Sequence, residues 1–388
     1  MTSIKTSALC LALGILAGAA QAAEPGVTAS EIRIGEVLPL TGPVSFAGEA
    51  HFLGTKVALA EANAAGGVAG RKVVAATEDD GYVPARAFQA AQKLLADGVF
   101  AITGTSGTSH LNAMLPLFIE QKVLTIVSIN PAEQAYNPVK KNIFVIGTDY
   151  GNAVYAVTKY AVEKLGKKNA RFGMVYQDDD FGANNLAGYQ RAVKDFGLKN
   201  VVEIPYKRGQ KDFSAEMLRV QNEKVDFLVS GGIIAENVAI FKEAKKLGLS
   251  DLRVGTVWTA HLPIVQQLSG EAGEGYYTAD YMADLSDAEA APFVEVAKKY
   301  LSADEMKKVN RYTMAAYSGA SILIQSMRAC EKDLTRDCVI AQLESGKTFA
   351  VNGATAPFGF SQTKHFSDSP VRVMQNDFKN GRFVRVTE

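Results

Sequence analysis

Residues 33–64, RIGEVLPLTGPVSFAGEAHFLGTKVALAEANA, contain a strand pattern, a turn and a helix pattern in that order. The apolar run Arg33–Leu40 ends at Thr41-Gly42-Pro43, and a helix pattern follows over Phe46–Ala64. This helix is expected to end at Gly66-Gly67, because glycine easily adopts the left-handed conformation that terminates helices. The same unit recurs along the chain. Because strands joined through helices of this length pair in parallel, we predict an α/β fold.

The repeated unit forms two series with a break near Gly147–Gly151, which predicts two doubly wound parallel-sheet lobes with helices on both faces. After the second series, a helical stretch returns to lobe one. A hairpin around Lys379-Asn380-Gly381 returns to lobe two, because Asn-Gly is a strong hairpin turn signal. Three crossovers and a cleft result. We predict lobe one as residues 23–147 and 280–355, and lobe two as residues 148–279 and 356–388.

The composition excludes several classes of protein. Of the 388 residues 47% are hydrophobic and 21% are charged, an ordinary globular composition that excludes a disordered chain and a multi-span membrane protein. Lys+Arg and Asp+Glu both number 41, so the chain has no net positive charge that would attract nucleic acid. We therefore expect no nucleic-acid partner.

The N-terminus has the pattern of an export signal. Lys5 precedes an apolar run over Ala8–Ala19, and Ala20-Gln21-Ala22 gives the small-x-small pattern of a cleavage site. The run is shorter than the roughly 20 residues that span a bilayer. We expect residues 1–22 to be a signal peptide that is removed near Ala22, which leaves an exported protein beginning at Ala23.

Two cysteines follow this segment, Cys330 and Cys338. An even pair, close in sequence in an exported protein, indicates a disulfide that closes a short loop between two helices. No His is nearby, so we expect no metal there.

Ligands of open α/β sheets collect at the carboxyl ends of the strands. The loop Gly104–Ser109 consists of small and hydroxyl residues and runs into the start of a helix. The free N–H groups at a helix start favour binding of a carboxylate. A simple Ser/Thr helix cap is the alternative. Asp178-Asp179-Asp180 resembles a metal or acid/base cluster, although a solvated turn has the same pattern. Trp258 ends a strand at the expected cleft, with a core position as the alternative.

Enzyme motifs are largely missing. The chain has no phosphate-binding Gly-x-x-x-x-Gly-Lys-Ser/Thr and no Gly-x-Gly-x-x-Gly after a strand. Ser106 and His110 stand four residues apart, which leaves a secreted hydrolase using Ser106 or Asp178–Asp180 as an alternative. The main expectation is a protein with no catalytic activity, no cofactor and no metal.

Several segments, in this order, resemble the periplasmic solute-binding proteins of the branched-chain amino-acid type, which deliver ligand to an ABC importer. They are Glu36–Pro43 (EVLPLTGP), Ala62–Gly70 (ANAAGGVAG), Glu78–Ala87 (EDDGYVPARA), Phe181–Gly182, Asp226–Gly232 (DFLVSGG) and Gly273–Tyr276 (GEGY). The resemblance implies two lobes, three hinge strands, a ligand buried between the lobes and no catalysis.

The resemblance also implies where a ligand lies. In amino-acid-binding members, the loop matching Gly107-Thr108 and the strand end matching Ser128–Pro131 hold the ligand carboxylate. Here Thr108, Ser128 and Asn130 are polar, so carboxylate capture is retained. The positions carried over as ligand-binding are Phe46, Ala47, Tyr82, Gly107, Thr108, Ser128, Ile129, Asn130, Tyr150, Phe181, Ile233, Trp258 and Tyr281.

The ammonium side of the pocket departs from the family pattern. Trp258 stands where those members have an acidic residue, and Phe181 and Ile233 stand where they have tyrosines. A buried ammonium without a charged partner costs several kcal/mol, although Asp179 or Asp180 is a substitute partner to consider. We therefore expect a small carboxylate without an α-amino group, an aromatic acid being one such ligand.

Three further expectations follow from the resemblance. The partner is an ABC permease in the inner membrane, and the chain is a monomer. Closure over the ligand produces the form that the permease recognises. Binding of a branched-chain amino acid and service as a ligand-sensing receptor module remain the alternatives.

Overall fold

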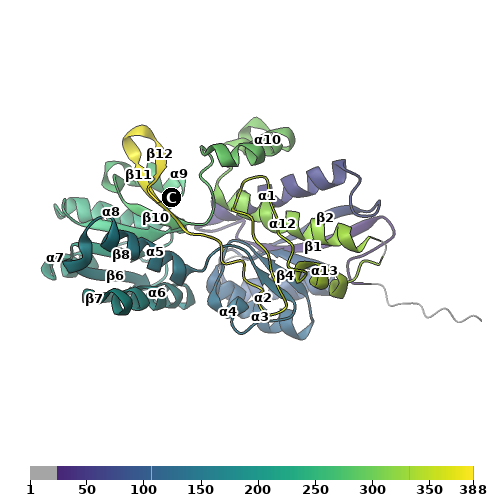
Figure 1. Ribbon diagram of the computed structural model, residues 1–388, viewed down its shortest axis with the longest axis horizontal. Coiled ribbons are helices and arrows are strands. Elements are labelled where there is room, and N and C mark those ends of the chain that lie inside the picture. The colour runs from purple at the N-terminus through teal and green to yellow at the C-terminus, as the bar shows by residue number, and fades with distance from the viewer. Residues whose placement is uncertain (1–23, 106, 332, 388) are drawn as a thin grey trace, which may run out of the picture.

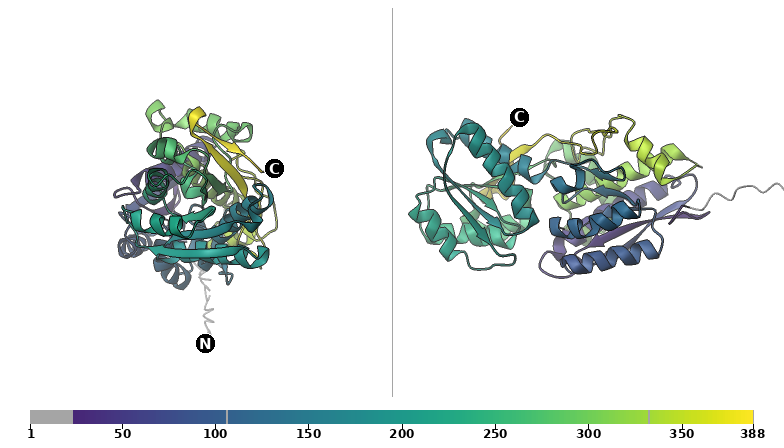
Figure 2. Two further views of the ribbon diagram at one scale, coloured as in Figure 1. Left: turned by 90° about the vertical axis from the view of Figure 1, so that its left-hand side faces the viewer. Right: turned by 90° about the horizontal axis from the view of Figure 1, so that it is seen from below.

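The computed structural model describes residues 24–105, 107–331 and 333–387, which form two lobes arranged along the long axis of the molecule (Figure 1). Each lobe is built around one sheet with helices on both faces, as the βα alternation predicts. Figure 2 shows the two lobes from below, joined by crossing segments. The predicted signal peptide and Ser106 lie outside the described residues.

Lobe one contains a five-stranded parallel sheet of order β2-β1-β3-β4-β5. Its strands are β1 (Glu31–Leu38), β2 (Lys72–Asp79), β3 (Ala101–Gly104), β4 (Leu124–Val127) and β5 (Ile143–Val145). Its helices are α1 (Ser45–Ala64), α2 (Pro84–Ala96), α3 (Thr108–Glu120), α4 (Glu133–Tyr136), α10 (Ala291–Tyr300), α11 (Ala303–Met306), α12 (Arg311–Cys330) and α13 (Arg336–Leu343).

Strands β3, β4 and β5 are buried throughout, because helices cover both faces of this sheet. Ile32 and Ile34 of β1 join the core under α1 and α12, whereas Val37 joins the core under α2 and α3. Because successive strand side chains alternate between faces, a single strand serves two hydrophobic cores.

Lobe two contains a seven-stranded sheet of order β12-β11-β10-β9-β8-β6-β7. Its strands are β6 (Arg171–Gln177), β7 (Lys199–Tyr206), β8 (Phe227–Gly231), β9 (Arg253–Val257), β10 (Tyr277–Asp280), β11 (Arg372–Asp377) and β12 (Arg382–Arg385). Its helices are α5 (Tyr150–Glu163), α6 (Asp180–Phe196), α7 (Ser214–Asn222), α8 (Ala235–Lys246) and α9 (Pro263–Ser269). The predicted hairpin is β11–β12, and it pairs antiparallel with β10.

Short 3₁₀ helices link these elements: η1 (Lys167–Asn169), η2 (Trp258–Ala260), η3 (Gly270–Gly273), η4 (Ala288–Ala290) and η5 (Phe378–Asn380). In the part of the chain that the structure describes, no helix combines the length and apolar character needed to cross a membrane.

The chain crosses between the lobes after β5, after β10 and before β11. The third crossing lies later than our predicted boundary at residue 356. Phe349 pairs with Phe358, and Val145 of β5 pairs with Phe366, so residues 356–367 pack on lobe one. Aromatic packing is the physical reason, because the rings of Phe144 and Phe360 meet edge to face with their centroids 5.3 Å apart.

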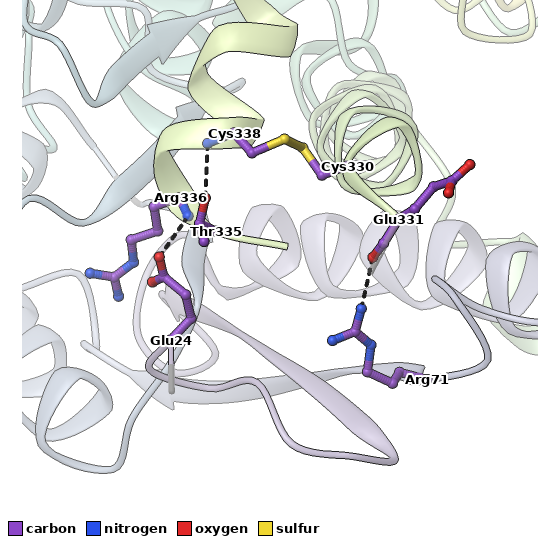
Figure 3. Close-up of a disulfide and its surroundings, with 7 residues drawn as sticks. All are labelled: Glu24, Arg71, Cys330, Glu331, Thr335, Arg336 and Cys338. Carbon is purple, nitrogen blue, oxygen red and sulfur yellow. Dashed lines mark hydrogen bonds between the residues drawn. A yellow bond between two sulfur atoms is a disulfide. The ribbon is translucent and has the colours of Figure 1, made fainter. Parts of the chain in front are cut away.

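Cys330 at the end of α12 and Cys338 in α13 form the predicted disulfide, with their Cα atoms 6.1 Å apart (Figure 3). Thr335 caps α13 by accepting a hydrogen bond from the Cys338 amide at 3.1 Å. The bridge thus holds the α12–α13 corner of lobe one, and the Arg336 amide beside it donates to Glu24.

Candidate functional site

The carboxyl ends of the strands of both lobes face each other across a small cavity of about 60 Å³. Lobe one contributes most of the lining, lobe two contributes the opposite wall, and Tyr150 comes from the first crossing. The lining residues are Pro39, Val44, Ala47, Tyr82, Gly107, Thr108, Ile129, Asn130, Tyr150, Phe181, Ile233, Ile234, Thr259 and Tyr312.

The polar part of the cavity, which we call the anion subsite, consists of Gly107 and Thr108 at the start of α3 and Asn130 after β4. The Asn130 side-chain amide donates to the Gly107 carbonyl at 3.1 Å, and its oxygen accepts from the Thr105 hydroxyl at 2.7 Å. The N-terminus of α3 lies at this end of the cavity, where the helix dipole favours an anion.

Gly107 is required by its surroundings. A Cβ atom at this position would lie 2.9 Å from both the Tyr82 hydroxyl and the His110 Nδ1 atom. The absence of a side chain therefore lets Tyr82 close over the start of α3. The Thr108 hydroxyl is buried close to the phenol of Tyr150, without a well-aligned hydrogen bond to it.

Aromatic rings supply much of the remaining lining. The Tyr150 ring meets the Phe181 ring edge to face at 4.8 Å, which joins the crossing segment to the lobe-two wall. Burial raises the pKa of Tyr150 well above its ordinary value. Burial likewise raises the pKa of Tyr312 to about 12, opposed by the charge of Arg311. Both phenols are therefore neutral at physiological pH.

His110 lies behind the lining, with its ring stacked on Tyr82 at 4.5 Å. Burial lowers the pKa of His110 to about 4, although a polar interaction of the ring with the backbone carbonyl side of Tyr82 opposes this effect. The imidazole is consequently neutral at physiological pH. The alternative pairing of His110 with Ser106 falls partly outside the described residues.

Trp258 lies one layer behind the cavity instead of in its wall. Its ring is fully buried and stacks on Tyr150 at 4.6 Å with an interplanar angle of 23°. Its neighbour Thr259 lines the cavity and donates a hydrogen bond to the Gly232 carbonyl at 2.8 Å. Trp258 therefore supports Tyr150 from behind and is not part of the lining.

Three other residues expected at the site also lie outside the lining. The Tyr281 hydroxyl donates to the Ser128 carbonyl at 2.6 Å, which ties the second crossing to the end of β4. The Ser128 side chain is buried. Phe46 is half-buried against the lobe-one core, and its neighbour Ala47 reaches the cavity.

A buried charge network lies next to the rings of Trp258, Tyr281 and Tyr312, and it was not expected from the sequence. Arg311, the first residue of α12, donates from Nε and Nη2 to both oxygens of Asp280 at 2.7 and 3.0 Å. His261 lies between two carboxylates, with Nδ1 2.7 Å from Asp280 and Nε2 3.1 Å from Asp284. The network links lobe two to the start of α12 at the second crossing.

The network is charged throughout. Burial alone would lower the pKa of His261, but hydrogen bonds and charge from Asp280 and Asp284 outweigh it and raise the pKa to about 9. Burial would raise the pKa of Asp280, but Arg311 and His261 lower it to about 2. Two cations therefore balance two anions, as burial of charge requires.

Arg311 also packs against aromatic rings near the cavity. Its guanidinium carbon lies 5.0 Å from the ring centroid of Tyr312 and 5.5 Å from that of Trp258. Tyr312, a lining residue that was not predicted from the sequence, directly follows Arg311 at the start of α12, which packs against α1. The other lining residues that were not predicted lie close to predicted ones in sequence: Val44, Ile234 and Thr259 are near Ala47, Ile233 and Trp258, and Pro39 belongs to the segment Glu36–Pro43.

The triple-aspartate segment is structural in part. One oxygen of Asp179 caps α6 by accepting from the Phe181 and Gly182 amides at 3.0 and 3.2 Å. Its other oxygen accepts from Gln177 Nε2 at 2.6 Å and from Arg208 Nε at 3.1 Å. Asp179 is therefore fully engaged with this chain's own donors.

The lining is largely apolar and aromatic, with polar groups at the start of α3. No Asp or Glu belongs to the lining as described. Within residues 24–105, 107–331 and 333–387, no cluster of three or more His, Cys, Asp or Glu could hold a metal ion. The cavity thus offers the start of a helix, a hydroxyl and apolar surface.

Comparison with known proteins gives a consistent result. Residues 31–382 match the model of a family described as "Periplasmic binding protein". The leucine-specific-binding protein of Salmonella typhimurium is 27% identical over 350 residues, which are 89% of this chain and 90% of the relative.

Solved structures share the whole architecture. A fatty acid ABC transporter substrate-binding protein from Thermomonospora curvata superposes with a TM-score of 0.80 and 26% identity, over 94% of this chain and 93% of the other. A solute-binding protein from R. palustris in complex with 4-hydroxybenzoate superposes with a TM-score of 0.81 over 92% and 96%. At 18% identity, the second likeness concerns the fold alone.

Proposed function

Because this chain belongs to the periplasmic binding protein family, we propose that it captures a small carboxylate without an α-amino group between its lobes. The closed form then presents this ligand to an ABC permease of the inner membrane. The observation that carries the proposal is the cavity itself: the N-terminus of α3 opens onto it, and no acidic side chain belongs to its described lining.

The electrostatics of the cavity favour an anion over a zwitterion. The α3 amides and the Thr108 hydroxyl offer hydrogen bonds to a carboxylate. An α-ammonium group would meet apolar and aromatic surface, and its desolvation would cost several kcal/mol. Asp179, one of the two candidate partners for a ligand cation, is engaged by Arg208, Gln177 and the start of α6.

The size of the cavity limits the ligand. A protein cavity of about 150 Å³ holds benzene, whereas this cavity has about 60 Å³. A short aliphatic acid therefore requires the least rearrangement. An aromatic acid fits the ring-lined walls once the lobes separate slightly further.

A thermal-shift screen tests this proposal. The chain from Ala23 onward is unfolded and refolded to remove any ligand carried through purification. It is then screened against leucine, isoleucine, valine, benzoate, hydroxybenzoates, cinnamates and short aliphatic acids. A ligand at 100 times its Kd adds about 2.7 kcal/mol of stability. We expect a response to acids alone; a response confined to the amino acids would contradict the proposal.

We propose the remaining assignments on the same basis. The chain acts as a monomeric binding protein, not as an enzyme, and it is exported to the periplasm with cleavage near Ala22. N-terminal sequencing of protein recovered from the periplasm should begin at Ala23. Secretion of the uncleaved chain would contradict the assigned site.

A further inference from the structure

Arg208 is a lobe-two cation that reaches lobe one beside the cavity. It lies in the loop between β7 and α7, and its Nη2 donates to the Ser109 hydroxyl of α3 at 2.9 Å. Its guanidinium carbon lies 5.5 Å from the centroid of the Tyr82 ring, also in lobe one. The side chain therefore spans the two lobes.

Asp179 holds this guanidinium in position within lobe two. Nε donates to Asp179 at 3.1 Å, and Nη2 is also within hydrogen-bonding reach of the same carboxylate oxygen. The Asp179 side chain is 14% exposed and the Arg208 side chain 30% exposed. Because Asp179 belongs to lobe two, the contact of Arg208 with Ser109 requires the lobes to be closed.

The position of Arg208 is next to the anion subsite. Ser109, its lobe-one partner, directly follows Thr108, and Tyr82, under its guanidinium, lines the cavity. No charged residue belongs to the described lining. An anion held at the start of α3 would therefore meet the field of Arg208 in a setting partly shielded from water, where charge interactions are stronger than in bulk solvent.

We propose that Arg208 couples carboxylate capture to lobe closure and determines the preference for an anionic ligand over a neutral one of the same shape. The proposal rests on the proposed function. In the open form Arg208 stays with Asp179 in lobe two. In the closed form it contacts Ser109 and adds positive charge beside the ligand carboxylate, so an anion favours the closed state more than a neutral ligand does.

Paired probes test the anion preference. Refolded wild type, Arg208→Gln and a control, Arg191→Gln, are titrated calorimetrically with benzoate against benzamide and with isobutyrate against isobutyramide. Arg191 is a suitable control because it also lies over a tyrosine, Tyr155, and donates to Asn152, both within lobe two. We expect Arg208→Gln to reduce the acid-over-amide preference at least about tenfold, and Arg191→Gln to leave it unchanged.

A double variant separates the loss of the cation from the exposure of Asp179. Asp179→Asn keeps a good helix-capping residue for α6, so Asp179→Asn/Arg208→Gln removes both charges. We expect the double variant to show the same reduced preference for the acids. An acid preference restored to that of wild type would mean that repulsion by Asp179, and not the loss of Arg208, caused the effect.

Small-angle scattering of the ligand-free proteins gives a measurement that does not depend on the ligand. We expect a larger radius of gyration for Arg208→Gln than for wild type, with Arg191→Gln unchanged. If wild type binds the acids but Arg208→Gln keeps their preference, the inference is wrong and the proposed function stands. If no probe binds wild type, the proposed function fails, and the radius of gyration then tests the role of Arg208 in closure. A larger radius for Arg208→Gln than for wild type supports that role, and an equal radius overturns it.

Discussion

At the scale of single residues, the Thr108 hydroxyl is the most direct test of the anion subsite. It is buried in the cavity wall at the first turn of α3. Thr108→Val keeps the shape and removes the hydrogen bond, which is worth about 1.5–3 kcal/mol when its partner is charged. We expect calorimetry to show binding of the acid weakened about tenfold or more.

The matched control is Thr158→Val. Thr158 is also a buried threonine, and its hydroxyl donates to the Val154 carbonyl within α5 at 2.8 Å. This variant should bind the ligand as wild type does. Equal affinity of the Thr108→Val variant and wild type would remove the hydroxyl from the subsite.

Trp258 gives a second prediction at this scale. Because the ring is fully buried against Tyr150, Trp258→Ala should lower the free energy of unfolding by about 3–5 kcal/mol. Trp258→Phe keeps an aromatic face under Tyr150 and should retain more of both stability and affinity. Urea unfolding and calorimetry measure the two effects. A stable Trp258→Ala protein with abolished binding would instead favour a direct ligand contact.

Residues at the site were predictable from the sequence to the extent that they lie in the segments between a strand and the next helix. Thr108, after β3, and Ile233, after β8, do so, and both line the cavity. Trp258 also follows a strand, but the 3₁₀ turn η2 directs Thr259 to the cavity instead. Tyr312 was missed because it begins α12, and only the packing of that helix against α1 brings it to the cavity.

At the scale of elements, the α12–α13 corner depends on the disulfide. Replacing both Cys330 and Cys338 by Ser releases a short loop, which should lower the free energy of unfolding by about 2–3 kcal/mol on the chain-entropy model. Denaturant unfolding without reductant measures this loss. Ligand affinity should not change, because neither cysteine lines the cavity. A stability equal to that of wild type would show that the bridge contributes nothing.

The elements themselves were largely predictable. Apolar runs over strands such as Phe227–Gly231 and the 3–4 spacing in α2 are local signals, so strand and helix positions follow from the sequence. The sequence of segment 356–367 shows neither the apolar run of a strand nor the 3–4 spacing of a helix. Its assignment to lobe one depends on aromatic contacts with Phe144 and Phe349, which are visible only in three dimensions.

At the scale of the whole molecule, the charge network at the second crossing should make stability depend on pH. The pKa of His261 is about 9 in the folded chain and about 6.5 when unfolded. Its contribution is complete below pH 6.5, where both states are protonated. It is lost as the pH rises toward 9, because the unfolded chain releases its proton first. The loss amounts to about 3 kcal/mol.

Urea unfolding of wild type and His261→Gln at pH 6 to 9.5 measures this contribution. The stability difference between the two proteins should shrink across that range. A difference that stays constant with pH would show that His261 is neutral in the folded protein.

The central claim is that two lobes close on a carboxylate that lacks an α-ammonium group. Leucine and 4-methylpentanoate differ only in that group, so calorimetric titration of the refolded chain with both tests the claim most directly. We predict that 4-methylpentanoate binds and that leucine binds at least about 100-fold more weakly, because nothing in the described lining offsets the desolvation of its ammonium. Tighter binding of leucine would contradict the account.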